Sequence, residues 1–157
     1  MSVEERIKAL GLVVPEAPKP VAAYLPGVEV DGLVITSGQL PMVDGELRFR
    51  GRVGAEVSPE EGYAAARLCA LNCLGVVRSV AGSLDRVARV VRLTGYVRST
   101  PGFEGQPGVL NGASELLLEV FGEAGRHARA AVGVSELPLG APVEVDLIVQ
   151  LHRTSLG

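Results

Sequence analysis

One helix signal constrains this chain more than any other feature of its sequence. The segment Ser58-Pro59-Glu60-Glu61 has the form of a capping box, with the serine as N-cap, the proline at the first helical position and the second glutamate reaching back. The apolar pattern that follows runs to about Ala81, where Gly82 ends it. This predicts a helix of about 24 residues, roughly 36 Å long. The segments on either side have the periodicity of strands, so the chain mixes helices and strands.

Three extended segments precede this helix. They are Ala22–Val30, Leu33–Gly38 and Glu46–Val53. Asp31-Gly32 separates the first two and Asp44-Gly45 precedes the third, and Asp-Gly is the strongest two-residue signal for a hairpin. The N-terminal third is therefore expected to form a three-stranded meander.

The chain after the first helix alternates between the two periods. Val87–Arg98 is rich in β-branched residues and predicts a strand, whereas residues 107–121 have apolar positions at helical spacing. Two more strands follow, in the stretch from His127 past Val145. The expected order is βββ-α-β-α-ββ, an α+β fold with a single sheet and two helices on one face. Val87–Arg98 carries apolar residues on both faces, so we expect an oligomer to bury the sheet face that no helix covers.

Length and composition indicate one domain. The 157 residues, 47% of them hydrophobic and 21% charged, suit a globular protein with a real core. Residues 1–157 are expected to form a single domain, in which residues 1–20 supply a short helix over about 2–10 and a Pro-rich extension. The first residues carry acids and no signal-peptide h-region, and no apolar run approaches the roughly 18 residues of a membrane span. We expect a cytoplasmic protein without a membrane partner.

Charge and cysteine content argue against two further classes of site. A net charge of −3 supplies no global field for nucleic acid. Cys69 and Cys73 lie four apart in the helix, and the two histidines, His127 and His152, complete no metal-ligand spacing. Two reduced, buried helix cysteines are the preferred interpretation over a metal site. We expect neither a metal nor an organic cofactor, since the chain has no ligand cluster, P-loop or dinucleotide fingerprint.

Two charged residues, Arg129 and Glu144, open otherwise apolar strands. A guanidinium keeps its charge, so Arg129 must reach water, an acid or an anionic ligand. Small residues share its strand face, which leaves room for a carboxylate to meet the guanidinium fork. A hairpin about Leu139-Gly140 would place the pair about 20 Å apart. A joint role then requires either another strand between their strands or a neighbouring subunit. The alternative is that Arg129 pairs with an acidic residue and simply holds subunits together.

Three segments of the chain resemble the YjgF/Rid family of reactive-intermediate (enamine/imine) deaminases, also labelled endoribonuclease L-PSP. They are SGQLP at Ser37–Pro41, GSLDRVARVV at Gly82–Val91, and the long block Asn111–Asp146. The resemblance covers about Tyr24 to Leu151, and the GRHAR segment with the longer N-terminus suggests a divergent branch. It implies a chorismate-mutase-like fold, a homotrimer and ligand clefts between subunits.

The resemblance also assigns site residues. It implies that Arg129 grips a substrate carboxylate, that Glu144, fifteen residues later, positions or activates water, and that Tyr24, thirteen residues before the serine of SGQ, walls the cleft from the next subunit. An asparagine of the second helix falls on Asn111, one residue out of register. Ala131 stands where the family usually has cysteine or serine, although its backbone N–H could still meet a carboxylate.

These residues would support hydrolysis of 2-imino and 2-enamino acids to 2-oxo acids and ammonia. Arg129 would orient the substrate and Glu144 would accept a proton from water, without a cofactor. Because Ala131 removes a polar group, the alternative is a trimeric small-carboxylate-binding or regulatory protein that catalyses nothing. A further alternative is RNA binding, in which Arg48, Arg50 and Arg52 track phosphates along one strand face. No histidine pair supports RNA cleavage, and Ser37 lacks a nucleophile elbow.

Overall fold

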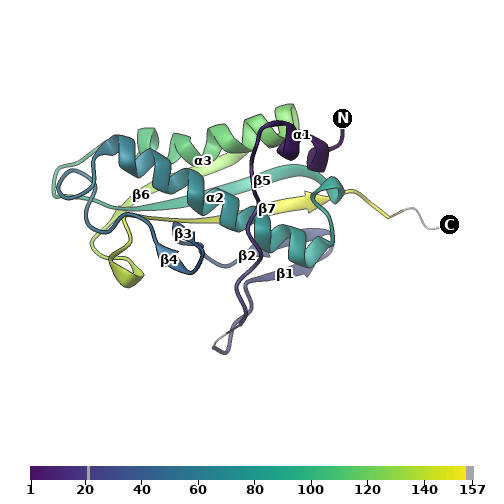
Figure 1. Cartoon of the computed structure of the whole chain (residues 1–157), viewed down its shortest axis with the longest axis horizontal. Helices are drawn as coiled ribbons and strands as arrows, with labels where there is room; N and C mark the ends of the chain where they lie inside the picture. Colours follow the sequence, from purple (N-terminus) through teal and green to yellow (C-terminus); the bar gives the residue numbers. More distant parts are fainter. Residues whose placement is uncertain (21, 155–157) are drawn as a thin grey trace.

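The computed structural model describes residues 1–20 and 22–154. Its centre is a five-stranded sheet in the order β1-β2-β7-β5-β6, with β5 parallel to β6 and the other pairs antiparallel (Figure 1). The strands of this sheet are β1 (Gly27–Val30), β2 (Leu33–Thr36), β5 (Val87–Arg98), β6 (Ala128–Val134) and β7 (Val143–Leu151). The order places β5 between the last two strands of the chain.

Helices connect the strands. They are α1 (Val3–Ala9), α2 (Pro59–Ala81) and α3 (Gln106–Phe121), with short 3₁₀ helices at Leu84–Arg86, Gly122–Gly125 and Pro138–Gly140. The capping box at the start of α2 is formed as predicted, and Gly82 is its C-cap. The predictions of α2, of β5 and of α3 are confirmed to within a residue at each end.

Both Asp-Gly pairs form the expected turns, but the meander they suggested is only half formed. Asp31-Gly32 joins β1 to β2, and Asp44-Gly45 joins β3 (Met42–Val43) to β4 (Glu46–Leu47). The prediction of a third strand over Glu46–Val53 in the same sheet is wrong, because β3 and β4 pair only with each other. The extended backbone ends at Leu47, and Phe49 adopts a positive φ of 60°.

α2 and α3 pack on one face of the sheet, as predicted, and on each other. Glycines allow the closest approaches: a Cβ on Gly95 of β5 would lie 2.2 Å from Leu110 of α3, and one on Gly112 of α3 would lie 2.1 Å from the Tyr63 carbonyl oxygen of α2. The sheet side chains beneath them, such as Leu93 and Leu147, are fully buried. The hydrophobic core therefore lies between the helices and this face.

The opposite face of the sheet, the open face, carries a mixture of side chains. Exposed apolar residues on it are Val28, Val30, Ile35 and Val132. β5 contributes polar residues there, including Arg92, Tyr96 and Arg98. The strict alternation expected for β5 is interrupted by register shifts between Val87 and Arg89 and between Val90 and Arg92. Val87, Val90 and Val97 are buried, whereas Val91 and Tyr96 are only half-buried.

α2 is long and apolar enough to cross a membrane by length and composition alone. Its apolar residues are accounted for by the fold, because they pack on the sheet and on α3. Cys69, Cys73, Leu74 and Val77 are all fully buried in this core.

Candidate functional site

Arg129 lies at the edge of the sheet and is held by α3. It is the second residue of β6 and pairs with Leu93 of β5, so its side chain is on the helix-covered face. Its Nη1 donates to the Asn111 side-chain oxygen at 2.9 Å and to the Ser114 hydroxyl at 3.2 Å. Asn111 and Ser114 are three apart on α3, so they share one side of the helix. The structure thus brings together Arg129 and Asn111, two of the predicted site residues.

A histidine extends this hydrogen-bonded network. His127 Nδ1 lies 2.6 Å from the Gly125 carbonyl oxygen, which can only accept, so Nδ1 carries the proton. In the neutral ring Nε2 then accepts from the Ser114 hydroxyl, 2.9 Å away. The Ser114 oxygen meanwhile accepts from Arg129. Sequence reasoning considered His127 only as a metal ligand and missed Ser114, although the spacing of 127 and 129 already places both on one strand face.

No carboxylate neutralises Arg129 within residues 1–20 and 22–154. Its two partners on α3 are neutral oxygens, and no described residue accepts a hydrogen bond from its Nε or Nη2. Within one chain this argues against the interpretation that Arg129 simply pairs with an acidic residue. A half-buried guanidinium oriented by neutral groups, with donors left over, suits a planar anion such as a carboxylate.

Glu144 lies on the open face of the sheet. It pairs with Tyr96 of β5, and a Cβ on Gly38 would lie 2.2 Å from its carboxylate oxygen, so a side chain at that position would displace the carboxylate. Burial, and then the neighbouring Asp146 carboxylate, raise the pKa of Glu144 above its usual value. Burial likewise raises the pKa of Asp146, although the Tyr96 hydroxyl donates to it at 3.2 Å. The two carboxyl groups form an acidic pair that the sequence had not revealed.

Arg129 and Glu144 lie on opposite faces of the sheet in one chain. Their partners on β5, Leu93 and Tyr96, are three residues apart, so their side chains point to opposite sides. The two strands flank β5 and are therefore separated by about 10 Å. The hairpin about Leu139-Gly140 is absent, and a strand between the two is the arrangement found. A site that uses both residues must combine two subunits.

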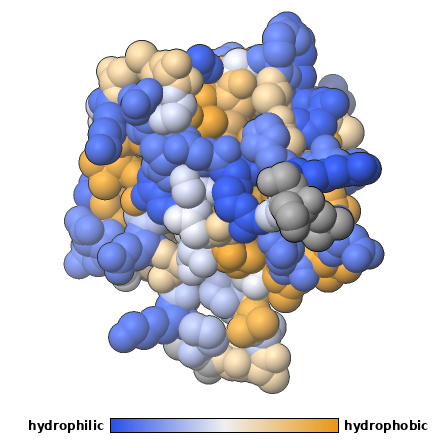
Figure 2. Space-filling model, turned by 90° about the vertical axis from the view of Figure 1, so that its right-hand side faces the viewer, coloured by the Kyte–Doolittle hydropathy of each residue, from blue (hydrophilic) through white to orange (hydrophobic). Residues whose placement is uncertain are grey.

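The remaining predicted residues are placed less tightly. Tyr24 is 61% exposed, on the segment before β1 that forms the projecting lobe at the bottom of Figure 2. No contact joins it to Arg129 within its own chain among the hydrogen bonds of the described residues. Ala131 is half-buried, pairs with Gly95 and packs against the core. Ser37 donates to the Leu25 carbonyl oxygen at 2.6 Å, a structural role near the base of the lobe.

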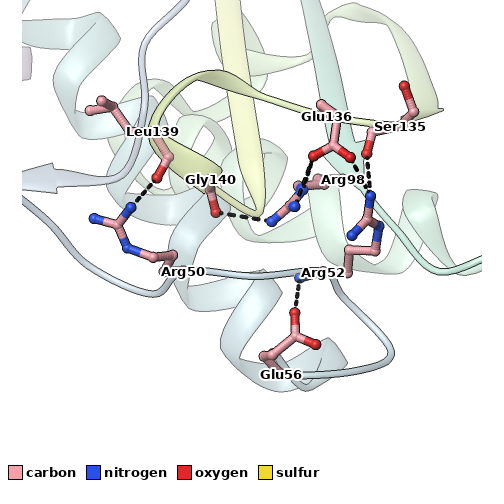
Figure 3. Close-up of polar contacts among 8 residues, drawn as sticks. All are labelled: Arg50, Arg52, Glu56, Arg98, Ser135, Glu136, Leu139 and Gly140. Atoms are coloured by element: carbon pink, nitrogen blue, oxygen red, sulfur yellow. Dashed lines mark hydrogen bonds and ion pairs between the residues drawn. The ribbon is translucent and has the colours of Figure 1, made fainter.

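Two of the three arginines considered for RNA binding, Arg50 and Arg52, hold a loop instead (Figure 3). Arg52 donates to the Ser135 carbonyl oxygen at 3.0 Å and pairs with Glu136, while Arg98 binds the same carboxylate at 2.9 Å. Arg50 donates to the Leu139 carbonyl oxygen. The expectation that Arg48, Arg50 and Arg52 share one strand face is wrong, because β4 ends before them.

Cys69 and Cys73 are free, fully buried thiols on the sheet side of α2, as predicted. Their sulfurs donate to the Val143 and Val145 carbonyl oxygens at 3.5 and 3.3 Å. Burial raises the pKa of both thiols. Among the residues that the structure describes, no group of three or more His, Cys, Asp or Glu side chains could hold a metal ion.

Comparison with known proteins places the chain in a family. Residues 4–151 match the model of the YjgF/chorismate mutase-like family, whose description also carries the label endoribonuclease. The chain is 46% identical over 152 residues to Protein TCP17 of Trypanosoma cruzi, covering 96% of this chain and 95% of that protein.

A solved structure and a named deaminase are also similar. The Agrobacterium tumefaciens protein Atu1372, of unknown function, superposes with a TM-score of 0.88 at 44% identity, covering 96% of this chain and 92% of that one. The 2-iminobutanoate/2-iminopropanoate deaminase of Dermatophagoides farinae is 29% identical over 138 residues, covering 88% of this chain and 93% of that protein. The chain belongs to the YjgF/chorismate mutase-like family.

Proposed function

We propose that the protein hydrolyses reactive 2-imino and 2-enamino acids to 2-oxo acids and ammonia. The reaction takes place in the cytoplasm, in clefts between the subunits of a homotrimer. Arg129 binds the substrate carboxylate, and Glu144 of another subunit holds the attacking water. The deaminase name of the mite relative supports this reaction class.

The observation that carries the proposal is the unneutralised guanidinium of Arg129. Asn111 and Ser114 engage Nη1 from α3, which leaves Nε and Nη2 for the two oxygens of a carboxylate. Charge-assisted bidentate contacts of this kind fix both the position and the plane of a ligand. The carbon next to the carboxylate, which bears the imine nitrogen, is then held in one place. Orientation of this kind lowers the barrier to attack by water.

Glu144 supplies the proton transfers. Its raised pKa brings the carboxyl group closer to the working pH of a general acid–base catalyst. The carboxylate takes a proton from water as the oxygen bonds to the carbon of the protonated imine, which gives a neutral carbinolamine. It then gives that proton to the nitrogen, the C–N bond breaks and ammonia leaves, and the hydroxyl loses its proton to the freed carboxylate as the C=O bond forms. The 2-oxo acid remains bound through Arg129 until it dissociates.

The first test measures ammonia release from freshly generated 2-aminoacrylate and 2-iminobutanoate. Arg129→Ala is expected to lower kcat/KM by about 100-fold, as expected for loss of charged hydrogen bonds to the ligand. Glu144→Gln is expected to lower kcat more than it raises KM. The matched control is Arg126→Ala, three residues away, whose exposed side chain pairs with Glu123. This control should keep full activity.

Two outcomes would contradict the proposal. If the wild type does not accelerate ammonia release, these imino acids are excluded as substrates. That result would favour the alternative of a small-carboxylate-binding protein. In that case binding of a stable 2-oxo acid such as 2-oxobutanoate should still depend on Arg129. If Arg129→Ala and Arg126→Ala reduce the acceleration equally, Arg129 does not anchor the substrate.

The RNA-binding alternative makes a different prediction. Binding of RNA that weakens steeply with salt and requires Arg48 would favour it.

A further inference from the structure

A cavity that Arg129 does not line lies beneath the N-terminal part of the chain. Residues 12–20, here called the strap, cross α2, and the β3–β4 ribbon lies beside them (Figure 1). Strap, ribbon and α2 together line a cavity of about 690 Å³. This volume is in the range of small-molecule sites. Neither Glu144 nor any residue of the Arg129 network lines it.

Specific contacts hold the walls of the cavity in place. The strap is seated by the buried side chain of Val14 and by Gly75 of α2, where a Cβ would lie 2.2 Å from the Pro15 carbonyl oxygen. On the other side, the Asn72 amide nitrogen donates to the carbonyl oxygens of Leu40 and Met42, at 2.9 and 3.0 Å. The cavity is therefore built into the fold rather than left by a loose segment.

The polar side chains that line the cavity present oxygen acceptors. Both amide hydrogens of Asn72 are used, so only its oxygen remains for a ligand. The amide nitrogen of buried Gln39 donates one of its two hydrogens to the Ser37 carbonyl oxygen at 3.3 Å, and its side-chain oxygen can accept from a ligand. Glu16 and Asp44, both exposed, add two carboxylates at the rim, one from the strap and one from the ribbon.

Among the described residues that line the cavity none is cationic, and the rest of its wall is largely apolar. Leu68 and Leu71 of α2 form part of its floor. Arg48 and Arg67 line a neighbouring hollow that shares these two leucines. A ligand that matches two carboxylates, two amide oxygens and an apolar floor must combine a positive charge or several N–H donors with an apolar body.

We propose that the cavity beneath the strap binds a small organic amine. The ammonium group lies between Glu16 and Asp44 and donates toward the side-chain oxygens of Gln39 and Asn72. The apolar part of the ligand rests on Leu68 and Leu71. This site is independent of the Arg129 cleft and of the reaction proposed for it.

Calorimetric titration of the full chain with 2-phenylethylamine tests the proposal. Saturable binding of one amine per chain is expected, with 2-phenylethanol and 3-phenylpropanoate at least about tenfold weaker, because the alcohol lacks the charge and the acid has the wrong sign. The double variant Glu16→Gln/Asp44→Asn should weaken amine binding by about five- to tenfold and leave alcohol binding unchanged. Arg129→Ala and Glu46→Gln, an exposed acid of the same ribbon, are controls and should bind the amine as the wild type does.

A second variant tests the strap without altering a charge. Gly75→Ala places a methyl group against the Pro15 carbonyl oxygen, so it should displace the strap and abolish amine binding while ammonia release is retained. Absence of amine binding to the wild type would overturn the proposal, as would equal affinity for amine and alcohol. Loss of binding in Arg129→Ala would also overturn it, because the amine would then occupy the other site.

Discussion

At the scale of single residues, this protein carries unusual charges on both faces of its sheet. Arg129 is a half-buried cation held by neutral oxygens, and Glu144 is a half-buried acid beside a second acid. Neither arrangement favours folding by itself, because desolvated charges without partners destabilise the folded state. Charged side chains that destabilise the folded state but remain free to contact a ligand are typical of functional sites.

Glu144 leads to a prediction about stability and pH. Burial and Asp146 raise its pKa in the folded chain, whereas in the unfolded chain it titrates near its ordinary value of about 4.3. Between these two pKa values the folded state binds more protons, so the free energy of unfolding falls as pH rises through this window. Glu144→Gln removes the charge, so the variant should be more stable than the wild type at pH 7.

Denaturant unfolding at a series of pH values checks this prediction. The stability advantage of Glu144→Gln should shrink as pH falls and disappear below about pH 4, where the carboxyl group is protonated in both states. Glu29→Gln, at an exposed side chain of β1, is the control and should show no such trend. The prediction is wrong if Glu144→Gln is less stable than the wild type at pH 7.

At the scale of secondary-structure elements, glycines set the distances between layers. Gly112 places α3 directly against the backbone of α2, and Gly95 lets Leu110 of α3 reach β5. These close approaches align Asn111 and Ser114 with the edge strand that carries Arg129. The packing of α3 therefore determines whether the guanidinium is oriented.

Two alanine substitutions in α3 test this packing. Gly112→Ala puts a Cβ 2.1 Å from the Tyr63 carbonyl oxygen, so it should force the helices apart and lower the free energy of unfolding by about 1–3 kcal/mol. Gly108→Ala lies in the same helix, where a Cβ meets nothing within 4 Å. It should stabilise the protein by up to about 1 kcal/mol through helix propensity. Equal effects of the two changes on chemical denaturation would refute the packing argument.

At the scale of the whole molecule, the open face of the sheet is the feature that one chain leaves incomplete. Val28 and Ile35 pair across β1 and β2 with their side chains exposed on it, and Val132 is exposed on β6. Glu144 lies on this face, whereas Arg129 is reached from the helix side. Association through the open face would bury apolar surface and give Glu144 a neighbour.

We therefore expect a homotrimer in solution. Light scattering on the eluting protein should give three times the chain mass of 16.3 kDa. Ile35→Glu puts a charge on the open face and should shift the protein toward monomers, with loss of ammonia release because the cleft is no longer shared. The control is Leu118→Glu, whose side chain is exposed on α3, and it should leave the mass unchanged. A wild-type monomer that is fully active would contradict both the trimer and the shared cleft.

Features determined within a few residues were predictable from the sequence. The capping box at Ser58 located the start of α2, and both Asp-Gly pairs formed turns with positive φ, because caps and turns satisfy their hydrogen bonds locally. The charges of Arg129 and Glu144 also stood out against apolar strands. Local pattern did not predict the end of the extended backbone at Leu47, where tertiary contacts of the arginines with the loop at 135–140 replace strand pairing.

Strand order and the packing of distant segments were decided only by the tertiary structure. The insertion of β5 between β6 and β7 puts Arg129 and Glu144 on opposite faces, a result of pairings that join residues far apart in the chain. The contacts of Ser114 with His127 and Arg129, and the cavity between strap and ribbon, depend on the same long-range packing. By itself the sequence determined which residues carry charge and where elements begin. Only the fold decided which charged residues lie in contact, because such contacts depend on packing between distant segments that no local pattern encodes.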